Sequence, residues 1–97
     1  MGTTVIVANK LDNVATIVKE LNTGDKITIE KGGDRVEVKV NERIPCYHKI
    51  ALRDIKKGDI VIKYGEAMGI ASSDILKGDY VHIHNVESKR ARGDKKS

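Results

Sequence analysis

Two stretches decide the fold of this chain: residues 51–65 read ALRDIKKGDIVIKYG, and residues 71–85 read ASSDILKGDYVHIHN. At this offset of twenty residues, seven of the fifteen aligned positions are identical. Each copy contains a Lys-Gly-Asp segment, in which glycine can adopt the left-handed conformation of a tight corner, followed by a run with strand character. The repeat therefore predicts two similar corners that bring two strands into equivalent positions.

Four aspartates occupy turn positions of this repeat. Aspartate is favoured at such positions because its carboxylate accepts hydrogen bonds from nearby main-chain N–H groups. We therefore interpret all four as structural: Asp54, Asp59, Asp74 and Asp79.

The first half of the chain predicts strands and one helix. Residues 4–8 have strand character, and residues 26–30 and 35–40 alternate with a period of two around a Gly-Gly turn, which is typical of a β-hairpin. Asp12 is a candidate N-cap of a short helix, because apolar residues then follow the helical spacing. These residues are Val14, Ile17, Val18 and Leu21. The predicted class is mainly β, a small α+β domain with one short N-terminal helix.

Size and composition narrow the class of protein further. The 97 residues suit one domain, and its core must be aliphatic because the chain has no Phe and no Trp. A single cysteine, Cys46, excludes an intrachain disulfide and favours a reducing, cytoplasmic compartment. No apolar run approaches the roughly 18 residues of a membrane span, and the N-terminal residues lack the pattern of a signal peptide. We therefore expect a soluble protein without a membrane partner.

The net charge of +4 is concentrated at the C-terminal end, where residues 86–97 carry +3 and residues 1–85 carry +1. A basic end on a nearly neutral body is more typical of a solvated, disordered tail than of a nucleic-acid-binding surface. We therefore expect a domain over residues 1–85, a basic tail over residues 86–97, and no nucleic-acid partner. Nucleic-acid binding through the tail is the least favoured alternative.

A His-x-His pattern is the most distinctive polar feature. In a strand, side chains two residues apart share a face, so His82 and His84 would lie beside Tyr80 with their Cβ atoms roughly 6 to 7 Å apart. With His48, they form a candidate three-histidine site for zinc or another divalent metal. Taken alone, the pattern better suits surface histidines that hydrogen-bond to their neighbours.

A longer string of dispersed residues carries a family resemblance. It comprises His48-Lys49-Ile50-Ala51, Asp54-Ile55, Gly58, Lys63-Tyr64-Gly65, Gly69-Ile70-Ala71, Asp74-Ile75, Gly78 and Val81-His82-Ile83-His84-Asn85. This string resembles the N-terminal SAF domain of altronate and galactarate dehydratases, and the small subunit of the related sulfolactate sulfo-lyases. Two residues depart from the family pattern: Tyr47 stands where glycine is common, and Ala67 where proline is common.

The resemblance implies a SAF-type β-clip fold in a small subunit that is inactive alone and works beside a separate large dehydratase subunit. The complex would be a hydro-lyase that removes water from a sugar acid, with Fe²⁺ or Mn²⁺ held mainly by the large subunit. The implied catalytic residues are His48, Lys49 and Tyr64; the substrate-binding residues are Lys49, Lys63 and Asn85; and the metal ligands are His82, His84 and His48. Taken alone, both lysines also suit solvent-facing amines.

Two alternatives stay open at this point. The chain could be a non-catalytic SAF-type module that binds an anionic carbohydrate. It could also be the small subunit of a sulfolactate sulfo-lyase, in which sulfite leaves instead of water.

Overall fold

The computed structural model describes residues 4–88 of the chain. This part contains nine strands and no helix. The strands are β1 (Thr4–Ala8), β2 (Val14–Thr16), β3 (Lys26–Lys31), β4 (Asp34–Lys39), β5 (Lys49–Ala51), β6 (Ile60–Lys63), β7 (Glu66–Ala71), β8 (Tyr80–Val81) and β9 (Val86–Ser88). The predicted mainly β class is confirmed, whereas the β-clip designation stays a prediction.

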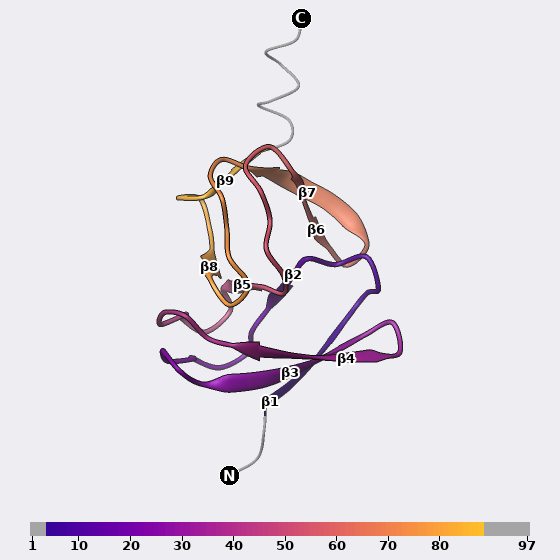
Figure 1. The fold of residues 1–97 in the computed structure, drawn as a ribbon, viewed down its shortest axis with the longest axis vertical. Helices are drawn as coiled ribbons and strands as arrows, with labels where there is room; N and C mark the ends of the chain where they lie inside the picture. Colours follow the sequence, from indigo (N-terminus) through magenta and orange to yellow (C-terminus); the bar gives the residue numbers. More distant parts are fainter. Residues whose placement is uncertain (1–3, 89–97) are drawn as a thin grey trace, which may run out of the picture.

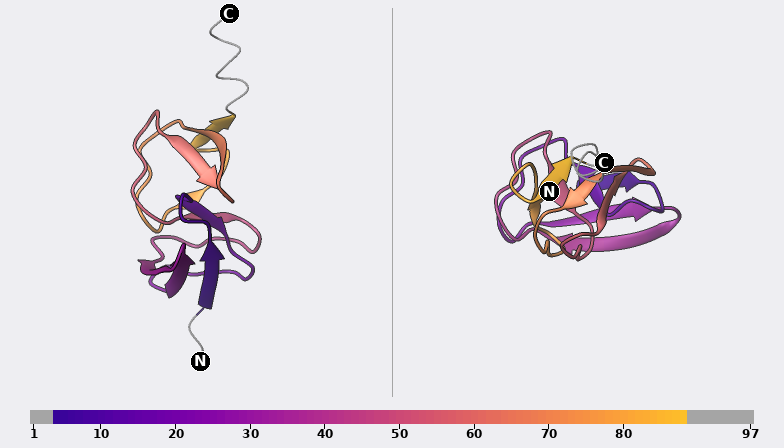
Figure 2. Two further views of the ribbon diagram at one scale, coloured as in Figure 1. Left: turned by 90° about the vertical axis from the view of Figure 1, so that its right-hand side faces the viewer. Right: turned by 90° about the horizontal axis from the view of Figure 1, so that it is seen from above.

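Three small sheets follow one another along the molecule, with strand orders β1-β3-β4, β2-β5-β8 and β6-β7-β9. In Figure 1 the first sheet lies at the bottom and the third at the top, and the second lies between them. Figure 2 shows the same order from the side. All pairings are antiparallel except that of β1 with β3, which is parallel.

The middle sheet separates two apolar clusters. On one face, Ala15 and Ile50 join a cluster that includes buried residues of β3 and β4, and Tyr80 packs against it. On the other face, Val14, Ala51 and Val81 join a cluster with residues of β6 and β7. Both faces of β2 are therefore covered, and its apolar residues run consecutively instead of alternating.

The predicted N-terminal helix is wrong, because Val14–Thr16 forms β2 and pairs with β5. The carboxylate of Asp12 accepts hydrogen bonds from the N–H groups of Asn9 (2.9 Å) and Gly65 (2.8 Å), and not from a first helical turn. Of the apolar residues that suggested the helix, Val18 is 68% exposed. A short apolar run buried on both faces does not distinguish a strand from a helix, and its β-branched residues favour the strand.

The strand over residues 4–8 and the β-hairpin were predicted correctly. β3 and β4 pair from Lys26↔Lys39 to Lys31↔Asp34. They turn through Gly32 and Gly33, whose φ angles of 57° and 96° lie in the region that glycine tolerates. β1 lies parallel to β3 and so completes the first sheet.

The sequence repeat folds into two corners that pair with each other. Ile55 and Ile75 exchange two main-chain hydrogen bonds of 2.8 and 2.7 Å. The carboxylate of Asp54 accepts from Lys77 N at 2.8 Å, and that of Asp74 accepts from Lys57 N at 2.9 Å. Each copy thus caps the corner of the other.

Asp59 and Asp79 cap their own corners. Asp59 accepts from Lys56 N at 3.3 Å, and Asp79 accepts from Leu76 N at 2.9 Å. All four aspartates of the repeat therefore bind main-chain donors, which confirms their structural role.

Two further corners of the same form, at residues 21–26 and 44–49, lie in the part of the chain where no sequence repeat is visible. Leu21 and Ile44 exchange main-chain hydrogen bonds of 3.0 and 2.9 Å, as Ile55 and Ile75 do. Three residues after each of these four bridge residues the backbone has a positive φ. The residues are Gly24 (92°), Tyr47 (68°), Gly58 (93°) and Gly78 (93°). The domain thus contains two pairs of related corners.

The last described strand extends the domain past its predicted boundary. Residues Val86–Ser88 form β9, which pairs with β7. The domain therefore continues at least to Ser88, three residues beyond the boundary predicted at residue 85. The rest of the predicted basic tail lies outside the described residues. Within residues 4–88 there is no helix with the length and apolar character needed to cross a membrane.

Removal of a cross-corner cap should destabilise the domain. We expect Asp54→Ala and Asp74→Ala each to lower the free energy of unfolding by about 1 kcal/mol, because each leaves a main-chain N–H without its carboxylate partner. Urea denaturation followed by circular dichroism measures this change. Ser73→Ala, at an exposed neighbouring position, is the control. Equal stability of all three variants and the unmodified chain would contradict the capping role.

Candidate functional site

The corner at residues 44–49 lacks the cap that stabilises the other three corners. In those, the aspartate after the glycine accepts from the N–H three residues earlier: Asp25 from Asn22 (2.8 Å), Asp59 from Lys56 and Asp79 from Leu76. Here the equivalent residue is His48, and the residue three positions earlier is Pro45, which has no N–H. The main-chain bond from His48 N to Pro45 O is kept at 3.2 Å. Position 48 is therefore free of the capping role, and it carries an imidazole.

Tyr47 is a second difference in this corner. It adopts a φ of 68° where the other three corners have glycine. For a bulky side chain this conformation costs of order 1 to 3 kcal/mol. The Tyr47 side chain is 74% exposed, so little packing offsets the cost. The corner that contains His48 therefore lacks two stabilising features that the other three corners have, the glycine and the aspartate cap.

His48 contacts two other rings at the edge of the middle sheet. Because Tyr80 pairs with Ile50, it shares a face with His48, which is two residues from Ile50. The Tyr80 hydroxyl and His48 Nδ1 lie 2.6 Å apart, in a hydrogen bond whose direction depends on the imidazole tautomer. The His82 ring centroid lies 4.8 Å from that of His48 and 5.7 Å from that of Tyr80. These three side chains, His48, Tyr80 and His82, are called the imidazole–phenol cluster below.

The chain leaves the strand directly after Val81, and residues 82–85 form a turn. Asn85 holds this turn, because its Oδ1 accepts from His82 N (3.0 Å) and its Nδ2 donates to Tyr80 O (2.9 Å). The strand alternation that was predicted to place His82 and His84 on one face is therefore wrong beyond Val81, and Ile83 in this turn is 82% exposed. Asn85 is buried and uses both ends of its amide internally; substrate binding by this residue stays a prediction.

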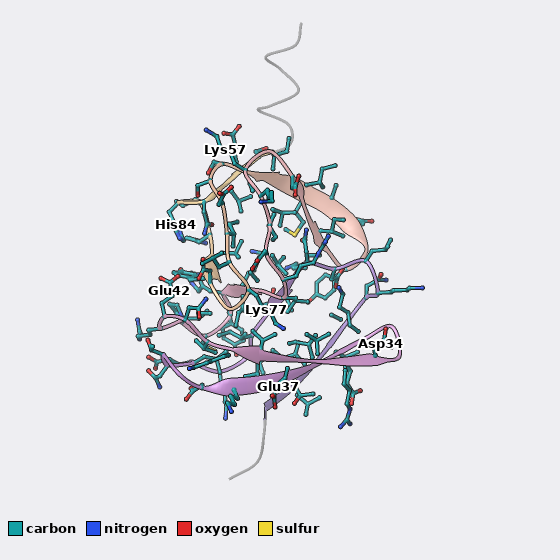
Figure 3. The ribbon with its side chains drawn as sticks, viewed as in Figure 1. Asp34, Glu37, Glu42, Lys57, Lys77 and His84 are labelled. Atoms are coloured by element: carbon teal, nitrogen blue, oxygen red, sulfur yellow. The ribbon has the colours of Figure 1, made fainter. Side chains whose placement is uncertain are left out.

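His84 lies on the same side of the molecule as Glu42, beside β8 (Figure 3). Its ring centroid is 5.3 Å from that of Tyr80. Tyr80 therefore contacts all three histidines, and its main-chain N–H donates to Glu42 at 3.2 Å. The sequence reasoning did not include Tyr80 among the site residues, although strand alternation had assigned it to the face of the histidines.

The two predicted lysines flank a common neighbour, Thr16. Lys49 is the cross-strand partner of Thr16 on one side and of Val81 on the other. Lys63 donates from Nζ to Thr16 Oγ1 at 3.1 Å, and its Nζ lies 4.8 Å from the centre of the Tyr64 ring. Tyr64 lies in the exposed β6–β7 turn, and its ring contacts Lys63 instead of a histidine.

A groove of about 280 Å³ opens beside the imidazole–phenol cluster. Lys49, His82, Glu87 and Ser88 line its polar part. Its apolar lining residues are Val61, Met68, Val81, Ile83 and Val86. The groove thus offers an ammonium, an imidazole and a carboxylate beside an apolar wall, and a small anionic group would bind at its Lys49 and His82 side.

Desolvation and neighbouring charges make the His82 imidazole less basic. Partial desolvation first, and then the charges of His48, Lys49 and His84, lower the pKa of His82 below its usual value of 6.5. The His82 imidazole is therefore mainly neutral at pH 7 and can accept a proton.

The three histidines do not form a complete metal-binding site in the described part of the chain. Residues 4–88 contain no group of three or more His, Cys, Asp or Glu side chains that could hold an ion. The three histidines gather around the Tyr80 ring, and Nδ1 of His48 is already hydrogen-bonded to the Tyr80 hydroxyl. This part of the chain alone does not fit a three-histidine metal centre, and ligation by these residues within a larger assembly stays a prediction.

The stacked sheets, the paired corners and the ring cluster define a small, mainly β domain with a partly exposed polar site at one sheet edge. Over residues 3–89 the sequence matches the altronate/galactarate dehydratase SAF domain, and the chain belongs to this family, as the resemblance predicted.

Altronate dehydratases and a sulfo-lyase subunit are among the relatives to which the chain is similar. The chain is 35% identical over 80 residues to an altronate dehydratase of Bacillus subtilis and 40% identical over 78 residues to one of Escherichia coli. These alignments cover 82% and 80% of this chain, but 15% of each relative. The chain is also 41% identical over 64 residues to a (2R)-sulfolactate sulfo-lyase subunit alpha of Paracoccus pantotrophus, covering 66% of this chain and 92% of that protein.

Lys49 should contribute to the lowered proton affinity of His82. We expect Lys49→Gln to raise the pKa of His82 towards 6.5, because the substitution removes one of the positive charges that lower it. Lys63→Gln, which removes a lysine that does not contribute to this shift, is the matched control. An NMR titration of the imidazole C–H resonances measures the pKa of His82 in both variants. An unchanged His82 pKa in Lys49→Gln would contradict the electrostatic account.

Proposed function

We propose that this chain is the small subunit of a sugar-acid dehydratase of the altronate/galactarate type, which acts in the cytoplasm beside a separate large subunit. The observation that carries the proposal is the imidazole–phenol cluster beside Lys49, within a domain of the dehydratase SAF family. The alignments cover about 15% of the length of the altronate dehydratases that the chain matches, and in this proposal a separate large subunit supplies the part of the enzyme that they do not cover. The sulfo-lyase relative is named as one subunit, and its alignment with this chain covers 92% of its length.

The residues of the cluster suit the elimination of water from a sugar acid. This reaction needs a base to remove the proton beside the carboxylate and an acid to protonate the leaving hydroxyl. A neutral His82 can accept a proton, and His48 can exchange one through its hydrogen bond with Tyr80. The ammonium group of Lys49 suits the substrate carboxylate, with Lys63 nearby through Thr16.

Tyr80 is a better candidate than Tyr64 for the phenol in this proposal. Tyr80 is hydrogen-bonded to His48, whereas the ring of Tyr64 contacts Lys63 in an exposed turn. Tyr64 would then act in catalysis after the large subunit binds, by contact with a substrate held at Lys63.

The partly exposed site also explains why the small subunit would be inactive alone. An elimination site needs to exclude water from the reacting groups, and both Lys49 and His82 are partly exposed. The large subunit would close the site, and it would hold most of the ligands of the divalent metal, Fe²⁺ or Mn²⁺.

Mixing the two chains tests the proposal. We expect the purified chain to restore dehydration of altronate or galactarate by the large dehydratase-like chain of the same organism. His82→Ala should reduce the restored rate by about 10² to 10⁴ fold, the usual effect of losing a general acid or base. Val7→Ser, at an exposed position of β1, is the control that should leave the rate unchanged. Absence of a complex and of any rate increase would exclude the subunit role.

The sulfo-lyase relative supports a second candidate, in which sulfite is the leaving group. In the same assay, (2R)-sulfolactate would then be the active substrate and sulfite the product.

Calorimetry on the isolated chain separates both subunit roles from a binding module. Micromolar binding of a sugar acid by this chain alone, without any effect on turnover, would favour the module.

A further inference from the structure

Each of the two contacting imidazoles has a large exposed apolar residue as its neighbour in the sequence. Tyr47 precedes His48 and is 74% exposed, and Ile83 follows His82 and is 82% exposed. Because the two imidazole centroids lie 4.8 Å apart, these residues flank one small polar site. In the isolated chain, most of the surface of both side chains is open to water, which is unfavourable for apolar groups.

The fold does not require either apolar side chain. The residues equivalent to Tyr47 in the other three corners are glycines, which the positive φ favours. In the sequence repeat, Ile83 aligns with Lys63, a polar residue. Contact of both side chains with a molecule outside this domain would account for their presence beside the histidines.

The groove next to the cluster continues this apolar surface. Ile83, Met68 and Val86 line it together with His82. β9 contributes Val86, Glu87 and Ser88 to the lining, so the last described strand runs along the groove. The apolar surface, the histidine pair and this end of the described domain therefore lie together.

We propose that Tyr47, Ile83 and the groove wall at Met68 and Val86 form the docking surface for the large subunit, which covers the histidine pair when it binds. This inference rests on the proposed function and adds the location of the contact. The occupant is the large chain, because the altronate dehydratase relatives carry this domain as 15% of a longer chain.

A second copy of this chain is a poorer occupant of the same surface. In a symmetric dimer each patch meets its own copy, so the Lys49 ammonium groups of the two copies would be brought into one covered site. Opposed like charges in an interface are unfavourable. A covering chain with acidic or neutral groups avoids this repulsion and withdraws the cluster from water.

Two substitutions copied from the chain itself test the surface. Tyr47→Gly introduces the residue of the other three corners, and Ile83→Lys introduces the residue of the first repeat. Neither should impair folding, and Tyr47→Gly should raise the melting temperature because it relieves the positive φ. We expect each to weaken binding of the purified large chain by about tenfold or more, as for a central aromatic or apolar contact.

Val7→Lys is the matched control. Val7 is also 74% exposed, but it lies on β1, in the sheet at the other end of the molecule (Figure 1). The affinity of the Val7→Lys variant for the large chain should stay within about twofold of that of the unmodified chain. Calorimetry or surface plasmon resonance measures this affinity.

The remaining outcomes separate this inference from the proposed function. If both variants bind the large chain as tightly as the unmodified chain and restore the same rate, the docking surface is refuted and the subunit role stands. If the unmodified chain forms no complex, the proposed function fails first. If the isolated chain dimerises and both substitutions abolish the dimer without weakening the large-chain complex, the surface belongs to a second copy and the inference is overturned.

Discussion

The exchange of main-chain hydrogen bonds between paired corners is the interaction on which the rest of the structure depends. Leu21 pairs in this way with Ile44, and Ile55 pairs with Ile75. All four side chains are buried, so each exchange satisfies main-chain polar groups within the core. A chain of 97 residues without Phe or Trp has a small core, and these exchanges join segments far apart in sequence where long strands are absent.

One of the four related corners differs from the other three in its stabilising residues. Three corners keep both stabilising features, a glycine at the positive φ and an aspartate that caps the turn. The fourth replaces these with Tyr47 and His48, and Pro45 removes the N–H that an aspartate would have capped. Because its bridge to Leu21 and its main-chain turn are kept, the fourth corner holds its shape while it presents an imidazole. Local rules of stability are typically broken at functional sites in this way.

The absence of the glycine and the aspartate from the corner at residues 44–49 also explains which corners could be predicted from the sequence. The second pair of corners was visible because both copies keep their Gly-Asp residues, and the β3–β4 hairpin was visible from its alternation and its Gly-Gly turn. The first pair was hidden because the corner at residues 44–49 has lost both diagnostic residues. β2 was mistaken for a helix because two sheets cover it, so its apolar residues do not alternate.

The sequence suggested which residue types gather at this sheet edge, and their functional roles stay predictions. The rings of His48 and His82 lie 4.8 Å apart, and strand pairing fixes Lys49 opposite Val81. The position of Tyr80 among the histidines depends on the contact of its hydroxyl with His48, and no sequence pattern reveals this contact. The outward position of Ile83 depends on Asn85, whose amide ends the strand by binding the main chain on both sides of Val81.

The charges around His82 suit a base that becomes stronger when an anionic substrate binds. In the isolated chain, the charge of Lys49 contributes to the lowered pKa of His82. If a substrate carboxylate pairs with Lys49, it offsets that positive charge, and the proton affinity of His82 rises as the substrate arrives. A covering chain would strengthen this coupling, because charges interact more strongly where water is excluded. The proposed closure by the large subunit and the proposed role of Lys49 thus depend on the same electrostatic interaction.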